Sequence, residues 1–148
     1  MDNSIAFKDR ELLYGALVKD LKLQKVDEVY YPESFGNYSI TFSAREFLIR
    51  YTSDRGQLFI FISSNYAPSK WYYLSVIKNF INNADKINVA DENNFSLKSI
   101  ILLNDFLKND FYKIAELLNE HHYKITLKQI DDLLLQEFKI TFPGAIKE

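Results

Sequence analysis

The chain has 148 residues, the usual size of one domain with one core, so we expect a single domain over residues 1–148. Its formal net charge of −2 argues against the many phosphate contacts on which nucleic-acid binding depends. The absence of cysteine excludes disulfides, thiolate nucleophiles and cysteine-based zinc sites. No apolar run approaches the ~18 residues of a membrane span, and residues 1–10 lack the apolar core of a signal peptide. We therefore expect a cytoplasmic protein that binds neither nucleic acid nor membrane.

The first predicted element is a helix over residues 7–22, where leucine and alanine recur at helical spacing between charged residues. The pattern of residues 26–31 leaves their secondary structure ambiguous, and Pro32 ends this stretch. Residues 38–63 then predict a three-stranded antiparallel meander, because short runs of alternating apolar and polar residues are separated by turn signals.

The last two strands of this meander flank the sequence Ser-Asp-Arg-Gly. Asp54 and Arg55 fit the centre of a type I turn, with Gly56 at a left-handed bulge position. This three-residue turn sets Tyr51 opposite Phe59. The preceding connection similarly sets Phe42 opposite Phe47 and Ile40 opposite Ile49.

This register divides the strand side chains between two faces, and a slip of one residue would exchange the faces of a whole strand. One face is apolar and is expected to form the core; it carries Tyr38, Ile40, Phe42, Phe47, Ile49, Tyr51, Phe59 and Phe61. The other face is half polar, and either solvent or the first helix covers it; it carries Ser39, Thr41, Leu48, Arg50, Thr52, Leu58, Ile60 and Ile62.

Three to four helices packed on the sheet are expected to follow, which makes the fold α+β. The first predicted helix contains Trp71 and ends near residue 81, and the second covers 96–120, with a break at Asn109–Asp110 left open. Thr126 and Gln129 match a capping box that predicts the start of the last helix. We expect a polar loop over 85–94 and a disordered or extended tail over 143–148.

No group of residues in the sequence indicates catalysis or a cofactor. His121 and His122 are adjacent, so on a helix they point about 100° apart, and we expect them to cap a helix end rather than bind a metal. Asp131 and Asp132 are also adjacent, whereas hydrolytic pairs of carboxylates face each other across a gap. We therefore expect no enzyme activity, no cofactor and no metal site.

The candidate partner-binding residues are two arginines and three acidic side chains. Arg50 lies in the middle of a strand; either it pairs with a carboxylate such as Glu46 and covers apolar surface with its stem, or it anchors an interface. Arg55 lies at the turn tip. The acidic candidates, which would steer a basic partner through charge, are Asp85, Asp91 and Glu92.

Aromatic residues are abundant, with 10 Tyr and 12 Phe, and they fit either a core of large rings or an aromatic binding surface. The single tryptophan, Trp71, fits the core, or one side of a groove beside residues 64–67.

The stretch 35–81 resembles a set of uncharacterised small bacterial α+β proteins. Their pattern is a strand ending in Arg-Tyr-x-x-Asp-Arg-Gly, present here at 50–56, followed by an aromatic strand and a Trp-containing helix. Residues 111–118 and the helix after Thr126 also look like theirs. The resemblance implies a small binding protein of the immunity type in toxin systems, and it implies no active site.

The sequence therefore predicts a non-catalytic protein-binding module, of the immunity type that neutralises a toxin domain. The alternative is a self-associating structural or adaptor protein that uses the half-polar face. An enzyme of unknown type is the third hypothesis.

Overall fold

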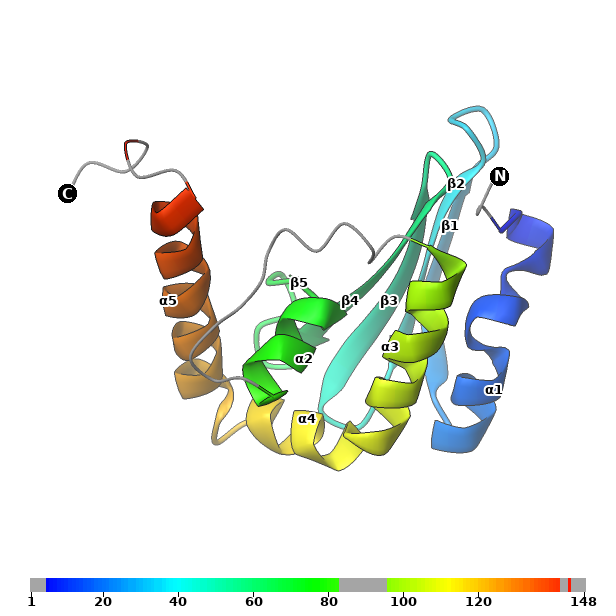
Figure 1. The fold of residues 1–148 in the computed structure, drawn as a ribbon. Helices are drawn as coiled ribbons and strands as arrows, with labels where there is room; N and C mark the ends of the chain where they lie inside the picture. The colour runs from blue at the N-terminus through cyan, green and yellow to red at the C-terminus, as the bar shows by residue number, and fades with distance from the viewer. Residues whose placement is uncertain (1–4, 83–95, 142–143, 145–148) are drawn as a thin grey trace.

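The computed structural model describes residues 5–82, 96–141 and 144. It is α+β: an N-terminal helix precedes a five-stranded antiparallel sheet, and several helices follow (Figure 1). The strands lie side by side in chain order; they are β1 (Gln24–Tyr31), β2 (Asn37–Ser43), β3 (Phe47–Asp54), β4 (Gln57–Ser64) and β5 (Tyr72–Tyr73). The described helices are the 3-10 turn η1 (Phe7–Asp9), α1 (Glu11–Leu21), α2 (Leu74–Asn82), α3 (Leu97–Asn109), α4 (Phe111–Leu118) and α5 (Tyr123–Thr141).

The prediction of three strands over 38–63 is wrong, because β1 and β5 extend the sheet on either side. β1 is an edge strand with a bulge between Lys25 and Asp27, and its charged, exposed residues hide the alternation that marks a strand. β5 has only two residues and lies within the stretch expected to be helical. Trp71 precedes β5 and is therefore not part of α2, which begins at Leu74.

The turn between β3 and β4 has two central residues, not the three expected. Asp54 pairs directly with Gln57, and φ is positive at both Arg55 (53°) and Gly56 (80°), which is the geometry of a type I′ turn. A left-handed backbone is costly for arginine because of its Cβ. Asn37 supports it: its Oδ1 accepts from the Arg55 N–H at 2.8 Å, and its Nδ2 donates to Asp54 at 3.1 Å.

This turn moves β4 by one residue relative to the expected register. Tyr51 pairs with Ile60 rather than with Phe59, so Phe59 and Phe61 lie half-buried on the face opposite the core. The expectation that both phenylalanines belong to the core is therefore wrong. The β4 side chains that take their place in the core are Leu58, Ile60 and Ile62.

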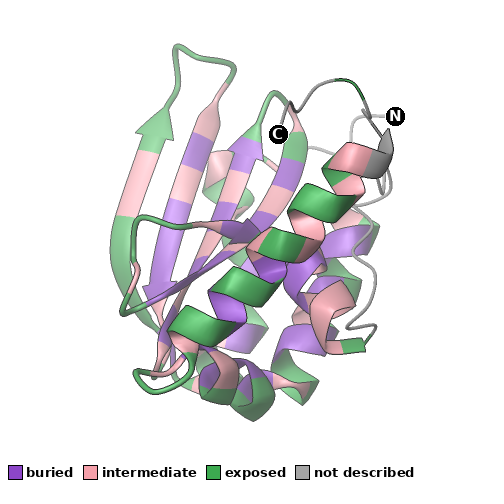
Figure 2. Ribbon diagram, turned by 90° about the vertical axis from the view of Figure 1, so that its left-hand side faces the viewer, coloured by how far each residue is buried: buried purple, intermediate pink, exposed green. Residues whose placement is uncertain are grey.

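The connection between β2 and β3 also differs from the prediction, but the side chains of both strands stay on their predicted faces of the sheet. Phe42 pairs with Ile49 and Ile40 pairs with Tyr51, a shift of two residues from the expected pairing. Because strand side chains alternate with a period of two, this shift leaves every residue of β2 and β3 on its predicted face. Buried and half-buried bands accordingly alternate along β3, whereas in β2 Thr41 is buried although it lies on the face opposite the core (Figure 2).

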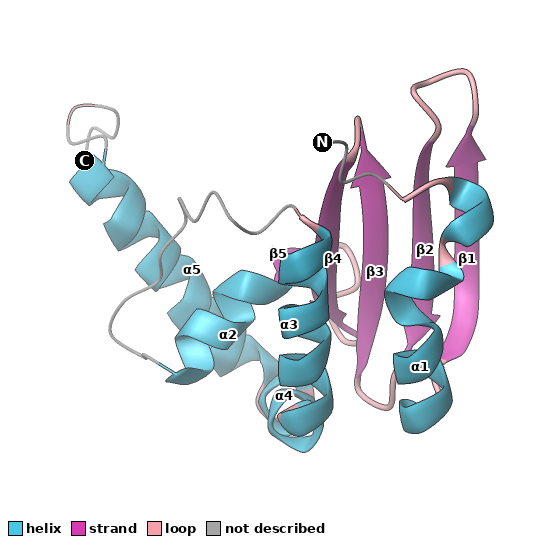
Figure 3. Ribbon diagram, turned by 45° about the vertical axis from the view of Figure 1, so that its right-hand side comes forward, coloured by secondary structure: helices cyan, strands magenta, loops and turns pink. Residues whose placement is uncertain are grey.

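Helices α1, α2 and α3 lie on one side of the sheet, and the core fills the space between them and the strands (Figure 3). A polar bridge crosses this core. The Tyr51 hydroxyl donates to Asn104 Oδ1 at 2.6 Å, and Asn104 Nδ2 donates to the Leu13 carbonyl at 2.6 Å. Burial raises the pKa of Tyr51 above its ordinary value, so the hydroxyl stays a proton donor. One bridge thus joins the central strand to α3 and α1.

The break at Asn109–Asp110 is confirmed, since α3 ends and α4 begins there. The capping box is wrong: α5 begins at Tyr123, and Thr126 is buried within it. The turn before α5 is organised by Asn119, whose side-chain oxygen accepts from the backbone N–H groups of His121 and His122 at 3.0 and 2.9 Å.

The predicted loop over 85–94 lies outside the described residues, as does the predicted tail except Gly144. No described helix is both long and apolar enough to cross a membrane.

Replacing Ile60 by alanine is expected to lower the free energy of unfolding by about 2–5 kcal/mol, because it empties a buried site. Phe61→Ala removes a larger side chain from the opposite, half-buried position and is expected to cost less than half as much. Urea unfolding of both variants measures the difference. A larger loss for Phe61→Ala would contradict this register and favour the three-residue turn.

Candidate functional site

The side of the sheet opposite α1–α3, here called the outer face, combines polar, apolar and aromatic side chains with one arginine. Strand pairing assigns to it, among others, Asp27, Val29, Ser39, Thr41, Leu48, Arg50, Thr52, Phe59, Phe61 and Tyr73, and Trp71 joins them through its contact with Arg50.

One row of this face crosses all five strands. Asp27 pairs with Thr41, Thr41 with Arg50, Arg50 with Phe61, and Phe61 with Tyr73. Directly paired side chains in antiparallel strands are close neighbours on one face. The pairing therefore places an arginine at the centre of the sheet, with a threonine on one side and aromatic rings on the other.

Arg50 is held by two neighbours. Its guanidinium carbon lies 4.0 Å from the centre of the Trp71 ring, and its Nε donates to Thr41 Oγ1 at 2.9 Å. The predicted pairing with Glu46 is absent, because Glu46 instead accepts from the Tyr66 hydroxyl at 3.0 Å. That hydrogen bond raises the pKa of Tyr66.

Three rings beside Arg50 form the outer aromatic cluster, defined as Phe59, Phe61 and Tyr73. The ring centres of Phe61 and Tyr73 are 4.9 Å apart, and Phe59 stacks within 6.0 Å of both. Tyr73 is 41% exposed. An exposed tyrosine and half-buried rings next to an arginine are typical of protein interfaces, where Tyr, Phe, Trp and Arg are enriched.

Arg55 does not belong to the same group. It is five residues further along the chain, roughly 15 Å away along a strand, at the tip of the hairpin. Its guanidinium lies 5.7 Å from the Phe35 ring, and its Nε lies 3.9 Å from Asp54. The structure thus separates the two candidate arginines. The predicted acidic candidates Asp85, Asp91 and Glu92 lie outside the described residues.

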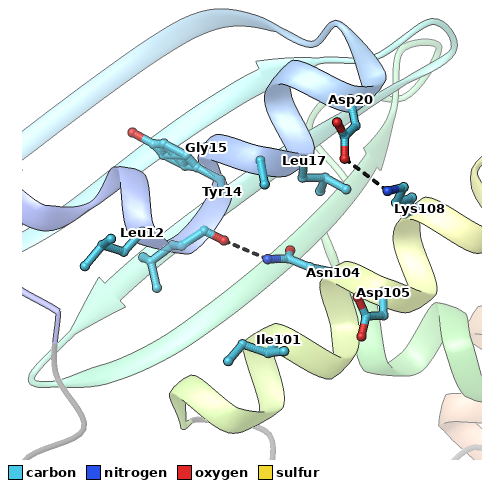
Figure 4. A pocket seen from close by; sticks show the side chains of 11 residues that line it. Leu12, Tyr14, Gly15, Leu17, Asp20, Ile101, Asn104, Asp105 and Lys108 are labelled. Carbon is cyan, nitrogen blue, oxygen red and sulfur yellow. Dashed lines mark hydrogen bonds and ion pairs between the residues drawn. The ribbon is translucent and has the colours of Figure 1, made fainter.

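A pocket of about 230 Å³ lies between α1 and α3, on the other side of the sheet (Figure 4). Three of its polar side chains pair within the chain: Asn104 binds the Leu13 carbonyl, and Lys108 binds Asp20 at 3.0 Å. These side chains hold α1 against α3. We therefore assign the pocket a structural role.

A second pocket, of about 440 Å³, lies between residue 67 and the first half of α5. Here Lys70 binds Asp131 at 3.0 Å, and Lys128 binds Asp132 at 3.2 Å. The two adjacent aspartates therefore each neutralise a lysine. Within the described ranges, no group of three or more His, Cys, Asp or Glu side chains lies close enough together to hold a metal ion.

Sequence reasoning named Arg50 and placed Thr41 on the same face, but it missed Trp71 and the neighbouring rings of β4. It placed Trp71 on a helix and the phenylalanines of β4 in the core. The signal that could have revealed the phenylalanines is the Arg-Gly pair at 55–56, which fits a two-residue turn as well as a three-residue one. Comparison of the chain with family models, curated proteins and solved structures gives no match.

Replacing Arg50 by alanine is expected to shift the fluorescence emission of Trp71 to longer wavelength, because the arginine no longer shields the indole ring from water. Trp71 is the only tryptophan in the sequence, so the emission reports this contact alone. Arg55→Ala is the matched control and is expected to leave the emission unchanged. Identical spectra for the wild type and Arg50→Ala would contradict the contact.

Proposed function

We propose that this protein is a non-catalytic protein-binding module that docks through the outer face, and that it is of the immunity type that neutralises a toxin. The observation that carries the proposal is Arg50 stacked on Trp71 beside the outer aromatic cluster. Arginine, tryptophan and tyrosine supply most of the binding energy at measured protein interfaces.

The charge of the outer face favours a protein partner over nucleic acid. Arg50 is the one cationic side chain among the residues that define this face. Binding to a nucleic-acid backbone draws on several cations, because each phosphate contact adds only a small part of the affinity. A face with a single arginine and several rings fits a protein surface better.

The immunity role narrows protein binding to one kind of partner. It draws on the resemblance of residues 50–56 to small bacterial binding proteins, and on a net charge of −2 that would attract a basic toxin domain. The alternative is self-association through the same face. A second copy would present the same arginine and the same rings, so the outer face would meet itself.

The immunity proposal expects a toxin domain encoded by a neighbouring gene, and that domain, once purified, is the binding probe in isothermal titration calorimetry; the absence of such a gene would count against the immunity role. The double variant Phe61→Ser, Tyr73→Ser is expected to weaken binding by about 100-fold, since it removes two rings from the interface. Tyr112→Ser is the matched control. Tyr112 is 80% exposed on α4, away from the outer face, and its replacement is expected to leave the binding affinity unchanged.

Equal affinity of the wild type and the double variant would contradict docking through the outer face. Sedimentation velocity addresses the alternative. A dimer that Arg50→Glu converts to a monomer would favour the self-associating adaptor over the immunity protein.

A further inference from the structure

We infer that Arg50 forms a carboxylate-binding site on the outer face, where an aspartate or glutamate side chain of the partner protein docks. The inference rests on the proposed function and adds the chemistry of the partner. The expected surface of the partner has an acidic side chain next to an apolar or aromatic one.

The first argument is that the Arg50 guanidinium is already fixed. Its plane lies against the Trp71 ring at 4.0 Å, and its Nε is tied to Thr41, which is only 3% exposed and cannot move freely. A free arginine loses about 2 kcal/mol of rotamer entropy when it becomes ordered. Here much of that loss has occurred before any partner arrives, which is the benefit of preorganisation.

The second argument concerns the donors that remain. An arginine has five N–H donors, and Arg50 uses the one on Nε. No hydrogen bond or ion pair within the described ranges engages its Nη1 and Nη2 atoms. They are not fully buried either, because Arg10 Nε is the one buried unpartnered side-chain atom among the described residues. The two Nη groups present parallel N–H bonds that match the two oxygens of a carboxylate.

The third argument is the setting of the charge. Phe61 and Tyr73 follow Arg50 along the row, so one side of the guanidinium faces rings rather than water. An apolar border strengthens a charge-assisted hydrogen bond and offers a surface for the residue next to the carboxylate. Asp27 lies on the same row beyond Thr41, about 10 Å from Arg50. It makes no ion pair with Arg50, so the ligand position on the Phe61 side stays open.

The setting also favours a carboxylate over a phosphate. Arg50 is the single cation among the outer-face residues, and it can balance one negative charge. A phosphate group carries up to two charges and is usually held by several donors or cations. The site therefore suits the single charge of an aspartate or glutamate side chain.

The experiment titrates the whole protein with sodium phenylacetate and follows the emission of Trp71, the only tryptophan. Phenylacetamide, which has the same ring but no charge, is the matched ligand. We expect a saturable change with phenylacetate, with a dissociation constant on the order of millimolar, and binding at least tenfold weaker for phenylacetamide. Arg50→Lys keeps the charge but loses the planar fork, so it is expected to weaken phenylacetate binding at least tenfold. Arg55→Lys is expected to bind as the wild type does.

Four results would overturn the inference. They are the absence of a saturable change with phenylacetate, equal binding of the amide, equal binding by Arg50→Lys, and tighter binding of phenyl phosphate than of phenylacetate. The toxin titration separates this inference from the proposed function. If Arg50→Lys binds the toxin domain as tightly as the wild type while Phe61→Ser, Tyr73→Ser does not, carboxylate docking is wrong and the binding module stands.

Discussion

The two-residue turn at Arg55–Gly56 decides which side chains of β4 reach the core. Its left-handed backbone is held by Asn37, which binds both the Arg55 amide and the Asp54 carboxylate. A three-residue turn would move β4 by one position and exchange its two faces. The outer face therefore owes its aromatic character to this turn, because only the observed register brings Phe61 next to Arg50.

The core and the proposed binding surface lie on opposite sides of the same strands. On the inner side, the bridge from Tyr51 through Asn104 to Leu13 fixes α3 and α1 over a core of buried aliphatic and aromatic residues. Among the described residues, the one buried side-chain polar atom left without a partner is Arg10 Nε. On the outer side, Tyr73 is 41% exposed, and the Nη groups of Arg50 have no partner among the described residues. An exposed ring and unpaired donors of this kind are typical of interaction surfaces.

The sequence predicted the α+β class, the first helix and the apolar faces of β2 and β3, and it named the position at which α3 and α4 separate while leaving the break open. These depend on local periodicity and on short-range turn chemistry. It failed where pairing decides the structure: β1 shows no alternation because it is a charged edge strand, and β5 is too short to have a pattern. Of the candidate site, Arg50 was predictable from its polar character in an apolar strand. Its contact with Trp71 was not, because it depends on β5 pairing with β4.

Nuclear Overhauser spectroscopy of the folded protein tests the central claim, that the turn places Arg50, Phe61 and Trp71 together on the outer face. The account predicts cross-strand contacts between the backbones of Tyr51 and Ile60 and of Arg50 and Phe61, together with contacts between the Arg50 side chain and the Trp71 indole. Backbone contacts between Tyr51 and Phe59, with no contact from Arg50 to the indole, would contradict it. In that case the phenylalanines would belong to the core, and the outer face would lose the site proposed for it.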